Sequence, residues 1–259
     1  MSTKIFEGKK ALIFGLANER SLAWAIAQRL SEGGAELAFT YPNEAIEKRM
    51  RPLAESLGAP LILPCDVARD SDIESTFAAV KEKWGVLDIL IHAVAFANRE
   101  DLDKRFVETS REGFRVALDI SAYSLLPMTR LAEPLMEGRG GGTVLTLSYY
   151  GAVKVIPNYN VMGVAKAALE ASVRYLAHDL GPKKIRVNAI SAGPVKTLAA
   201  AGIKGFRDML AMAEQKNPLK ENISAEDVGD LAAFLCGPGG KHITGSTLYV
   251  DSGAHIMGA

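Results

Sequence analysis

The feature that most constrains the fold of this 259-residue chain is a regular alternation of short apolar runs with helical patterns. The apolar runs have the length of buried strands, and the segments between them carry apolar residues at helical spacing. In the first half, the pattern predicts strands at residues 11–14, 36–39, 61–63 and 87–93 and helices at 21–30, 44–57 and 73–84. Strands that alternate with helices of this length indicate βαβ units, a parallel sheet and helices on both of its faces.

The second half of the chain continues the same pattern. Strands are predicted at 143–147, 185–190 and 248–250, and helices at 114–135, 158–179 and 225–235. Ser224, followed three residues later by Asp227, is a near capping box for the last helix, and Gly181 with Pro182 ends the helix before it. Because no linker or repeat interrupts the pattern, the fold class is predicted as α/β, a single Rossmann-type doubly wound domain over residues 1–259 with about seven parallel strands.

Composition excludes several classes of function. Thirty basic and thirty acidic residues give a net charge of zero, which argues against a nucleic-acid surface or a polybasic membrane patch. The two cysteines, Cys65 and Cys236, form no CxxC pair, so we expect buried thiols rather than a disulfide or a metal site. No apolar run has the length of a membrane span and the first residues are not a secretory signal, so the expected location is the cytoplasm.

Three strand ends suggest a nucleotide site. Gly15 follows the first strand and allows a tight turn, and Ser21 then opens a helix whose free N–H groups can face a pyrophosphate. The loop has one glycine instead of the usual three, so an ordinary turn is an equal alternative. Asp66 follows the third strand and can accept from an adenine amino group, or it can be a turn aspartate. Small residues at 93–97 allow a flat ring to approach the backbone.

The end of the second strand bears on the choice of cofactor. An acidic residue there would favour NAD and an arginine would favour NADP, and the segment 39–44 has neither at the strand end. Lys48 and Arg49 lie a turn into the following helix. The absence of a close basic pair therefore favours NADH weakly.

Tyr159 and Lys166 are the most informative pair of polar residues. They are seven positions apart, two turns of the predicted helix, so they share one face. Tyr149 follows the strand that ends at Ser148, so two tyrosines and a lysine can meet at the carboxyl edge of the sheet. Hydride addition to a conjugated carbonyl leaves an oxyanion, which a tyrosine hydroxyl can stabilise, and an ammonium can favour the phenolate or hold a ribose. In isolation, a core tyrosine and a surface lysine would be the simpler interpretation.

Further motifs support a functional interpretation of Tyr159 and Lys166. A general Tyr-x3-Lys pattern would place the lysine at position 163, where the chain has Gly163, and the lysine stands at Tyr-x6-Lys spacing instead. Other matching segments are 147–149, 156–160, 186–194, 197–200 and 226–229. On these residues the chain resembles the short-chain dehydrogenase/reductase superfamily, and within it the bacterial enoyl-acyl-carrier-protein reductases of type II fatty-acid synthesis. The resemblance extends from about residue 12 to 253.

The resemblance implies roles for individual residues. Tyr159 would stabilise the enolate at the thioester oxygen, Tyr149 would be a second tyrosine and candidate proton donor, and Lys166 would hold the nicotinamide ribose. The implied cofactor-binding residues are Gly15, Ser21, Leu22, Asp66, Val67, Val94, Lys166, Val195, Lys196, Thr197, Leu198 and Ala199. The implied substrate-binding residues are Ala97, Tyr149, Tyr159, Met162 and Phe206, with a lid around 195–215.

The resemblance also implies cofactor and partners. These are NADH rather than NADPH, an acyl carrier protein that bears 2-enoyl chains, and a homotetramer, with no metal, nucleic acid or membrane. Pro42 departs from the family, which often has a glutamine there that contacts the adenosine, and this weakens the expected NADH preference.

Two rival functions remain open. One is a 3-ketoacyl or other carbonyl reductase of the same superfamily, which Gly163 argues against, because a lysine would be expected there. The other is a non-catalytic NAD-binding regulator, which would not need Tyr149, Tyr159 and Lys166 together. His92 is interpreted as a hydrogen-bonded strand residue rather than a catalytic base.

Overall fold

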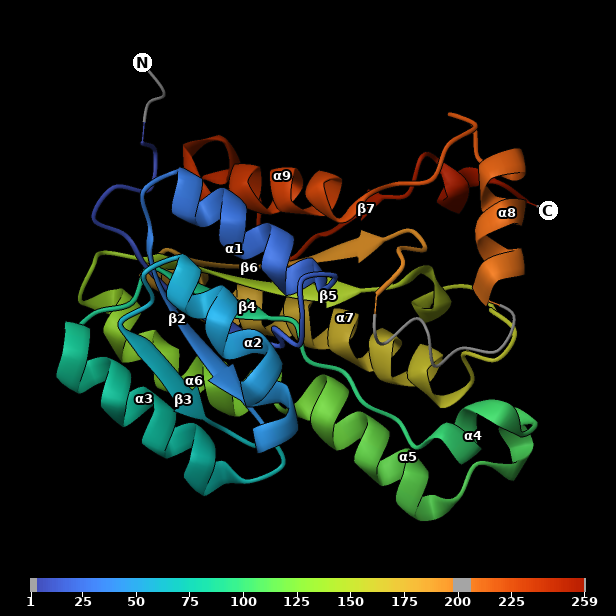
Figure 1. The fold of residues 1–259 in the computed structure, drawn as a ribbon, viewed down its shortest axis with the longest axis horizontal. Coiled ribbons are helices and arrows are strands. Elements are labelled where there is room, and N and C mark those ends of the chain that lie inside the picture. Colours follow the sequence, from blue (N-terminus) through green and yellow to red (C-terminus); the bar gives the residue numbers. More distant parts are fainter. Residues whose placement is uncertain (1–3, 198–205, 259) are drawn as a thin grey trace.

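One parallel sheet forms the centre of the molecule (Figure 1). The structure is a computed structural model that describes residues 4–197 and 206–258. In that part of the chain the sheet has seven strands in the order β3-β2-β1-β4-β5-β6-β7, and every neighbouring pair is parallel. The strands are β1 (Lys10–Phe14), β2 (Glu36–Tyr41), β3 (Leu61–Pro64), β4 (Ile89–His92), β5 (Gly142–Ser148), β6 (Ile185–Ala192) and β7 (Thr247–Val250). The predicted Rossmann-type α/β fold is confirmed.

Helices cover both faces of this sheet. The α-helices are α1 (Leu22–Glu32), α2 (Glu44–Ser56), α3 (Asp70–Trp84), α4 (Arg99–Asp103), α5 (Arg111–Leu118), α6 (Leu125–Glu137), α7 (Val161–Leu180), α8 (Phe206–Lys216) and α9 (Ala225–Cys236). Alternate residues of β1 show the two layers. Ala11 and Ile13 pack in the core cluster with α1, α2 and α9, whereas Leu12 and Phe14 pack with α3, α6 and α7. This double burial explains why the strands are apolar throughout.

The local signal at the start of α9 is reliable. Ser224 accepts from the backbone N–H of Asp227, and the Asp227 carboxylate accepts from the backbone N–H of Ser224, so the predicted capping box forms. The sequence also marks Pro52 as a possible break in the helix predicted at 44–57. The break does not occur, because α2 continues through the exposed proline to Ser56.

The helix predicted over 114–135 is wrong as a single element. It is two helices, α5 and α6, separated by a π-helical turn at Asp119–Tyr123. Two serines of this region bond groups outside their own helix. The Ser121 hydroxyl bonds the backbone of Phe96, and the Ser124 hydroxyl bonds the side chain of His92. Such wide turns are frequent at functional sites, and apolar periodicity does not reveal them.

The helix predicted from residue 158 also begins too early. Asn158 has φ 63° and Asn160 has φ 39°, so neither can belong to a right-handed helix. Helix α7 begins at Val161 instead. Tyr159 therefore lies on the turn before the helix, and the argument that it shares a helical face with Lys166 does not hold.

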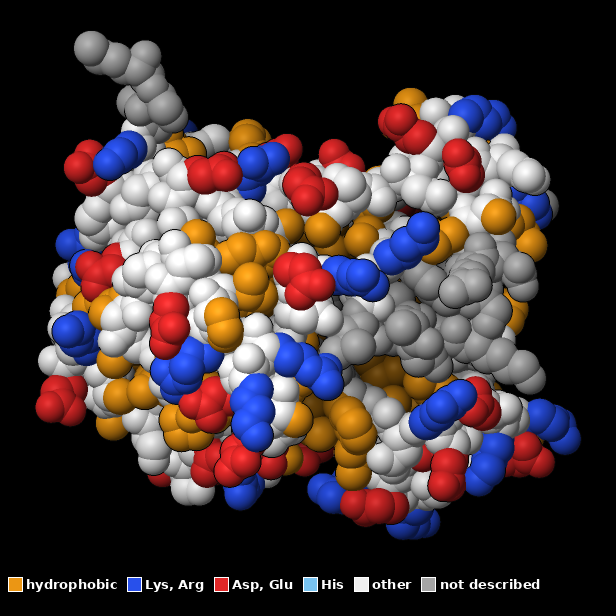
Figure 2. All heavy atoms as spheres, in the orientation of Figure 1, with side chains coloured by type: hydrophobic (Ala, Val, Ile, Leu, Met, Phe, Trp, Pro, Cys, Tyr) orange, Lys and Arg blue, Asp and Glu red, His pale blue; other side chains and the backbone are white. Residues whose placement is uncertain are grey.

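The surface and the thiols agree with the composition. Figure 2 shows acidic and basic side chains interspersed over one face of the molecule. Cys65 is buried, as expected, whereas Cys236 is only half-buried. Across residues 4–197 and 206–258, no helix is both long enough and apolar enough to cross a bilayer.

Candidate active site

The candidate residues gather at the carboxyl edge of the sheet because each follows the end of a strand. Gly15 follows β1, Asp66 follows β3, Val94 follows β4, Tyr149 follows β5 and Val195 follows β6. Parallel strands end at one edge, so segments far apart in the sequence meet there. The central strand arrows point toward the end of the molecule where α4 and α8 lie (Figure 1). This edge is therefore where a ligand can meet all five segments.

Two tyrosines lie in contact at this edge. The ring centroids of Tyr149 and Tyr159 are 4.9 Å apart and the rings meet edge to face at 71°. Tyr159 is almost fully buried and belongs to a small apolar cluster that also contains Met162, with Ala97 packed against it. The structure thus brings together four of the five residues predicted to bind substrate.

Burial governs the acidity of both tyrosines. It raises the pKa of Tyr159 far above the ordinary value, with a smaller contribution from neighbouring Tyr149, and it also raises the pKa of Tyr149. The expectation that Lys166 favours a phenolate is not supported, because burial disfavours the charged form. Both hydroxyls therefore stay protonated at neutral pH, which suits donation of a hydrogen bond to an oxygen that gains negative charge.

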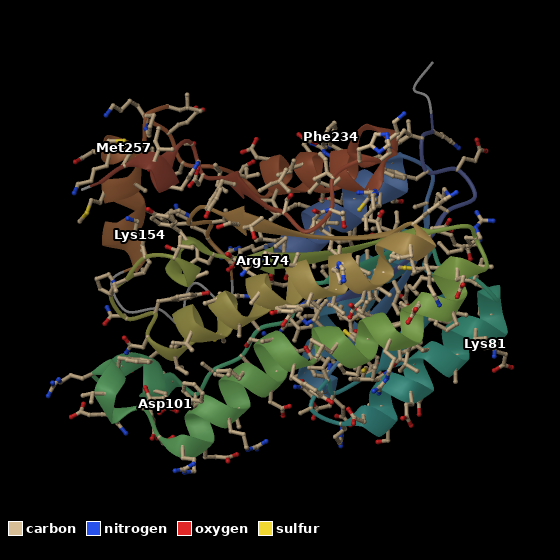
Figure 3. All side chains as sticks on the ribbon, turned by 180° about the vertical axis from the view of Figure 1, so that it is seen from behind. Lys81, Asp101, Lys154, Arg174, Phe234 and Met257 are labelled. Carbon is tan, nitrogen blue, oxygen red and sulfur yellow. The ribbon has the colours of Figure 1, made fainter. Side chains whose placement is uncertain are left out.

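The turn that carries Tyr159 is held by contacts that the sequence did not reveal. The Asn160 side chain donates to the carbonyls of Leu102 and Lys104, at 2.9 and 2.6 Å. Figure 3 labels Asp101 in the segment that these bonds hold beside the start of α7. A Cβ added to Gly151 would overlap the Tyr159 ring, with Cε1 at 2.8 Å and Cδ1 nearer still, so only glycine allows this packing. A positive φ at Asn160 costs about 1–3 kcal/mol, and the two carbonyl bonds offset it.

The segment after Tyr149 contacts the C-terminal end of the chain. The Tyr150 hydroxyl donates to the carbonyl of His255 at 3.0 Å. The His255 ring stacks on Tyr249 with centroids 4.1 Å apart and pairs with Asp251 through Nδ1 at 3.0 Å. Figure 3 shows Lys154 and Met257 at the same end of the molecule. The C-terminal residues are therefore bonded to the segment that directly follows Tyr149.

Lys166 is buried beneath this edge. Only 5% of it is exposed, and its Nζ donates to the carbonyl of Leu147 at 2.7 Å. Burial lowers the pKa of Lys166 to about 8, and the carboxylate of Glu170 acts in the opposite direction. An ammonium has three donors, and among the described residues the Leu147 carbonyl alone accepts from it, so two are left for other acceptors such as ribose hydroxyls.

The loop after β1 fits a dinucleotide. Gly15 has φ 95°, and a Cβ there would lie 2.5 Å from the carbonyl carbon of Ala93. The Ser21 hydroxyl accepts from the backbone N–H groups of Ala17 and Asn18, both at 3.1 Å, and so folds the loop instead of capping α1. Among the described residues nothing accepts from the backbone N–H groups of Leu22 and Ala23, and the first turn has no acidic residue. This donor set suits the pyrophosphate of a dinucleotide.

Asp66 takes part in a turn, as the alternative interpretation held. Its Oδ1 accepts from the backbone N–H of Ala68 at 3.1 Å, and Arg69 lies 3.7 Å from its Oδ2. The side chain is still 39% exposed, so an adenine contact remains a prediction. Val67 and Val94 are partly buried against the core beneath this end of the sheet.

The predicted lid lies partly outside the described residues. Val195, Lys196 and Thr197 follow β6, and the N–H of Thr197 donates to the carbonyl of Val195 at 2.8 Å. Leu198, Ala199 and the side chain of Phe206 lie outside the described residues. Helix α8 occupies 206–216, within the range predicted for the lid.

His92 is a buried structural residue, as expected. Its Nδ1 lies 2.8 Å from Thr146 Oγ1 and its Nε2 lies 2.8 Å from Ser124 Oγ. Burial lowers the pKa of His92 to about 3, so the ring is neutral at physiological pH. Ser121, which sequence reasoning missed, accepts from the Phe96 N–H at 2.9 Å and donates to the Phe96 carbonyl, so it fixes the loop between Val94 and Ala97. A serine within an apparently regular helix gives no sequence signal for such a role.

The fold and this set of residues define a Rossmann-type oxidoreductase of the short-chain dehydrogenase/reductase class. A family sequence model described as "Enoyl-(Acyl carrier protein) reductase" matches residues 15–255. The chain is 52% identical over 254 residues to enoyl-[acyl-carrier-protein] reductase [NADH] FabI of Aquifex aeolicus, covering 98% of this chain and 94% of that protein. The chain belongs to the enoyl-(acyl carrier protein) reductase family.

Two solved structures of family members resemble this one closely. The reductase from Anaplasma phagocytophilum, in complex with NAD, has a TM-score of 0.94 and 50% identity, covering 98% of this chain and 97% of that chain. The reductase from Bacillus cereus, with NADP+ and an indole naphthyridinone, has a TM-score of 0.95 and 47% identity, covering 98% of this chain and 99% of that chain. The first complex contains NAD and the second contains NADP+.

Proposed function

We propose that this protein is an NADH-dependent enoyl-[acyl-carrier-protein] reductase of type II fatty-acid synthesis. The observation that carries the proposal is the edge-to-face pair of Tyr149 and Tyr159 at the carboxyl edge of the sheet, with buried Lys166 beneath it. NADH, when bound, supplies the hydride that is added to C3 of a trans-2-enoyl thioester. The protein's task is then to hold the two reactants and to stabilise the negative charge that develops on the thioester oxygen.

Tyr159 is the residue we assign to that oxygen. Its protonated hydroxyl donates a hydrogen bond to the developing enolate, and a fixed donor at such a position contributes about 3–4 kcal/mol to catalysis. Tyr149 is the second tyrosine within reach and a candidate donor of the proton that C2 receives. Met162 and Ala97 form the apolar wall against which the acyl chain packs. We place Phe206 on the same wall and the segment 195–215 over it as a lid.

The remaining residues hold the cofactor. Lys166 directs its two remaining N–H donors to the nicotinamide ribose. Gly15, Ser21 and Leu22 form the pyrophosphate site at the start of α1, and Asp66 with Val67 lines the adenine. Val94 lies along the adenosine ribose. The segment that follows β6 approaches the nicotinamide and the phosphates through Val195, Lys196, Thr197, Leu198 and Ala199.

A cofactor oxidation assay tests the function. Purified protein is mixed with NADH and a 2-enoyl thioester, and the loss of reduced-nicotinamide absorbance is followed, with NADPH in a parallel reaction because Pro42 lacks a side-chain donor toward the adenosine. We expect turnover of the enoyl thioester with NADH and little with NADPH. Turnover of a 3-ketoacyl thioester but not of the enoyl thioester would instead identify a carbonyl reductase, and turnover of neither would favour a regulator.

We further propose the partners and the setting. The substrate is presented by an acyl carrier protein, the enzyme is a single domain that works in the cytoplasm, and four copies assemble into a homotetramer. Light scattering coupled to size-exclusion chromatography should give about four times the mass of one chain. A monomer at assay concentration would contradict the assembly without affecting the proposed reaction.

A further inference from the structure

Glu170 is a buried carboxylate without a role in the site described above. It lies on α7, one helical turn after Lys166, and only 8% of it is exposed. Carboxylates are rarely buried unless a partner or a charge compensates for the lost hydration. Its partner is Ser148, whose hydroxyl donates to Glu170 Oε1 at 2.5 Å. The position of Ser148, immediately before Tyr149, suggests that this bond serves the site.

Two bonds fasten α7 to the end of β5. Lys166 Nζ donates to the carbonyl of Leu147, and Glu170 accepts from Ser148, the next residue of the strand. Lys166 and Glu170 are four residues apart, so they lie one above the other on the same face of the helix. The two bonds therefore fix the end of β5, from which Tyr149 projects. They also fix the position of the Lys166 ammonium relative to that strand end.

The charges around Lys166 point to the same pairing. Lys166 is faced by Glu170 on its own helix and by His92 on β4, and His92 is neutral because burial lowers its pKa to about 3. Tyr249 on β7 is a further titratable group that senses Glu170, and it is uncharged at neutral pH because burial raises its pKa. Among the described residues, Glu170 is thus the charge that favours the protonated form of Lys166.

We propose that Glu170 is a positioning residue that keeps Lys166 charged and fixed at the end of β5, so that its ammonium can bind the nicotinamide ribose. This inference rests on the ribose-binding role proposed for Lys166. It goes beyond that role because it assigns the strength and the pH range of cofactor binding to a carboxylate that itself touches neither cofactor nor substrate.

Loss of the Glu170 charge should move the pH dependence of cofactor binding. The pKa of Lys166 is already lowered to about 8, and loss of the Glu170 charge, which acts to raise that pKa, lowers it further. The ammonium would then be lost near neutral pH. We expect NADH binding by Glu170→Gln to be about fivefold weaker than in the parent at pH 8 and nearly unchanged at pH 6, because both proteins keep the ammonium in acid.

NADH titrations of the full-length protein, followed by the fluorescence of the bound nucleotide from pH 6 to pH 9, test the proposal. Glu170→Gln should weaken binding with a midpoint about one pH unit below that of the parent. Glu170→Asp keeps the charge, so its midpoint should lie close to that of the parent. The matched control is Glu74→Gln, which removes an exposed carboxylate on α3 and should leave the midpoint where it is.

Two results would overturn the proposal. The first is an equal loss of affinity at every pH in Glu170→Gln, since a purely structural defect weakens binding without moving the midpoint. The second is a shifted midpoint that persists when Glu170→Gln is added to Lys166→Ala, because no ammonium is left to titrate there. If Glu170→Gln fails to fold, Glu170→Met, which also removes the charge, replaces it, and an unchanged midpoint in that variant counts against the proposal. Since binding is measured without a thioester, failure of the proposed reaction would be seen separately, in the turnover assay.

Discussion

Gly15 offers the sharpest test of how the cofactor end of the site is built. Gly15→Ala adds a single methyl group at a backbone φ of 95°, where only glycine is comfortable. The same methyl group would overlap the carbonyl group of Ala93, the residue that follows β4, with the carbonyl carbon at 2.5 Å. The backbone of one of the two strand ends must therefore move.

The structure separates these two costs. Gly58 also has a positive φ, of 67°, but a Cβ there meets nothing within 4 Å. Gly58→Ala should therefore cost only the backbone strain, about 1–3 kcal/mol. Gly15→Ala should cost that strain and in addition about 1–3 kcal/mol for the forced displacement. For a domain of this size each kcal/mol lowers Tm by about 2–4 °C, so Gly15→Ala should melt at least about 2 °C below Gly58→Ala.

Thermal unfolding of the parent and the two variants, with and without NADH, measures both effects. Displacement of the turn also moves the amino end of α1, so NADH should raise the Tm of Gly15→Ala less than that of Gly58→Ala or the parent. Equal melting temperatures for the two variants, or an equal rise with NADH, would show that the contact with Ala93 does not hold the turn in place.

Three further predictions concern the catalytic pair and the buried histidine. Tyr159→Phe should lower kcat by about 10²–10³ while NADH affinity stays within about twofold, and an unchanged kcat in steady-state assays would remove Tyr159 from the mechanism. Lys166→Ala should instead raise the Kd for NADH in fluorescence titrations, and a normal Kd would contradict its ribose contact. The lowered pKa of His92 means that the unfolded chain binds a proton which the folded protein does not, so stability should fall by about 1.4 kcal/mol per pH unit as pH drops below about 6.5. In His92→Asn the urea midpoint should depend less on pH over this range, and the same slope in both proteins would refute the assignment.

Much of the fold could be predicted from the sequence because strand and helix periodicities differ and the strands are buried on both sides. The end of the sheet that carries the site followed from parallel pairing alone. The start of a helix could also be predicted where a polar residue is followed three residues later by an acidic one, as at Ser224. A single sequence contains these signals, because they depend on neighbouring residues or on the apolar character of buried segments.

The remaining errors arise where tertiary contacts override local preference. The turn at Tyr159 depends on Asn160, whose side chain bonds carbonyls more than fifty residues earlier in the chain. The π-helical turn at Asp119–Tyr123 inserts one extra residue into an otherwise continuous apolar stripe. The sequence gives no signal for Glu170, because its partner Ser148 lies on strand β5 and not on its own helix. No spacing rule within a single segment reports such long-range partners.

The contact of Tyr150 with the carbonyl of His255 has a practical consequence for anyone who handles this protein. It joins the C-terminal segment to the residue that directly follows Tyr149, so a purification tag or fluorescent fusion attached close after His255 would compete with that bond. The first described residues instead pack near Gly33, where the N–H of Phe6 donates to the Gly33 carbonyl at the far end of α1. Attachments belong at the amino terminus, and crosslinkers or surface anchors for immobilised enzyme should be directed there too.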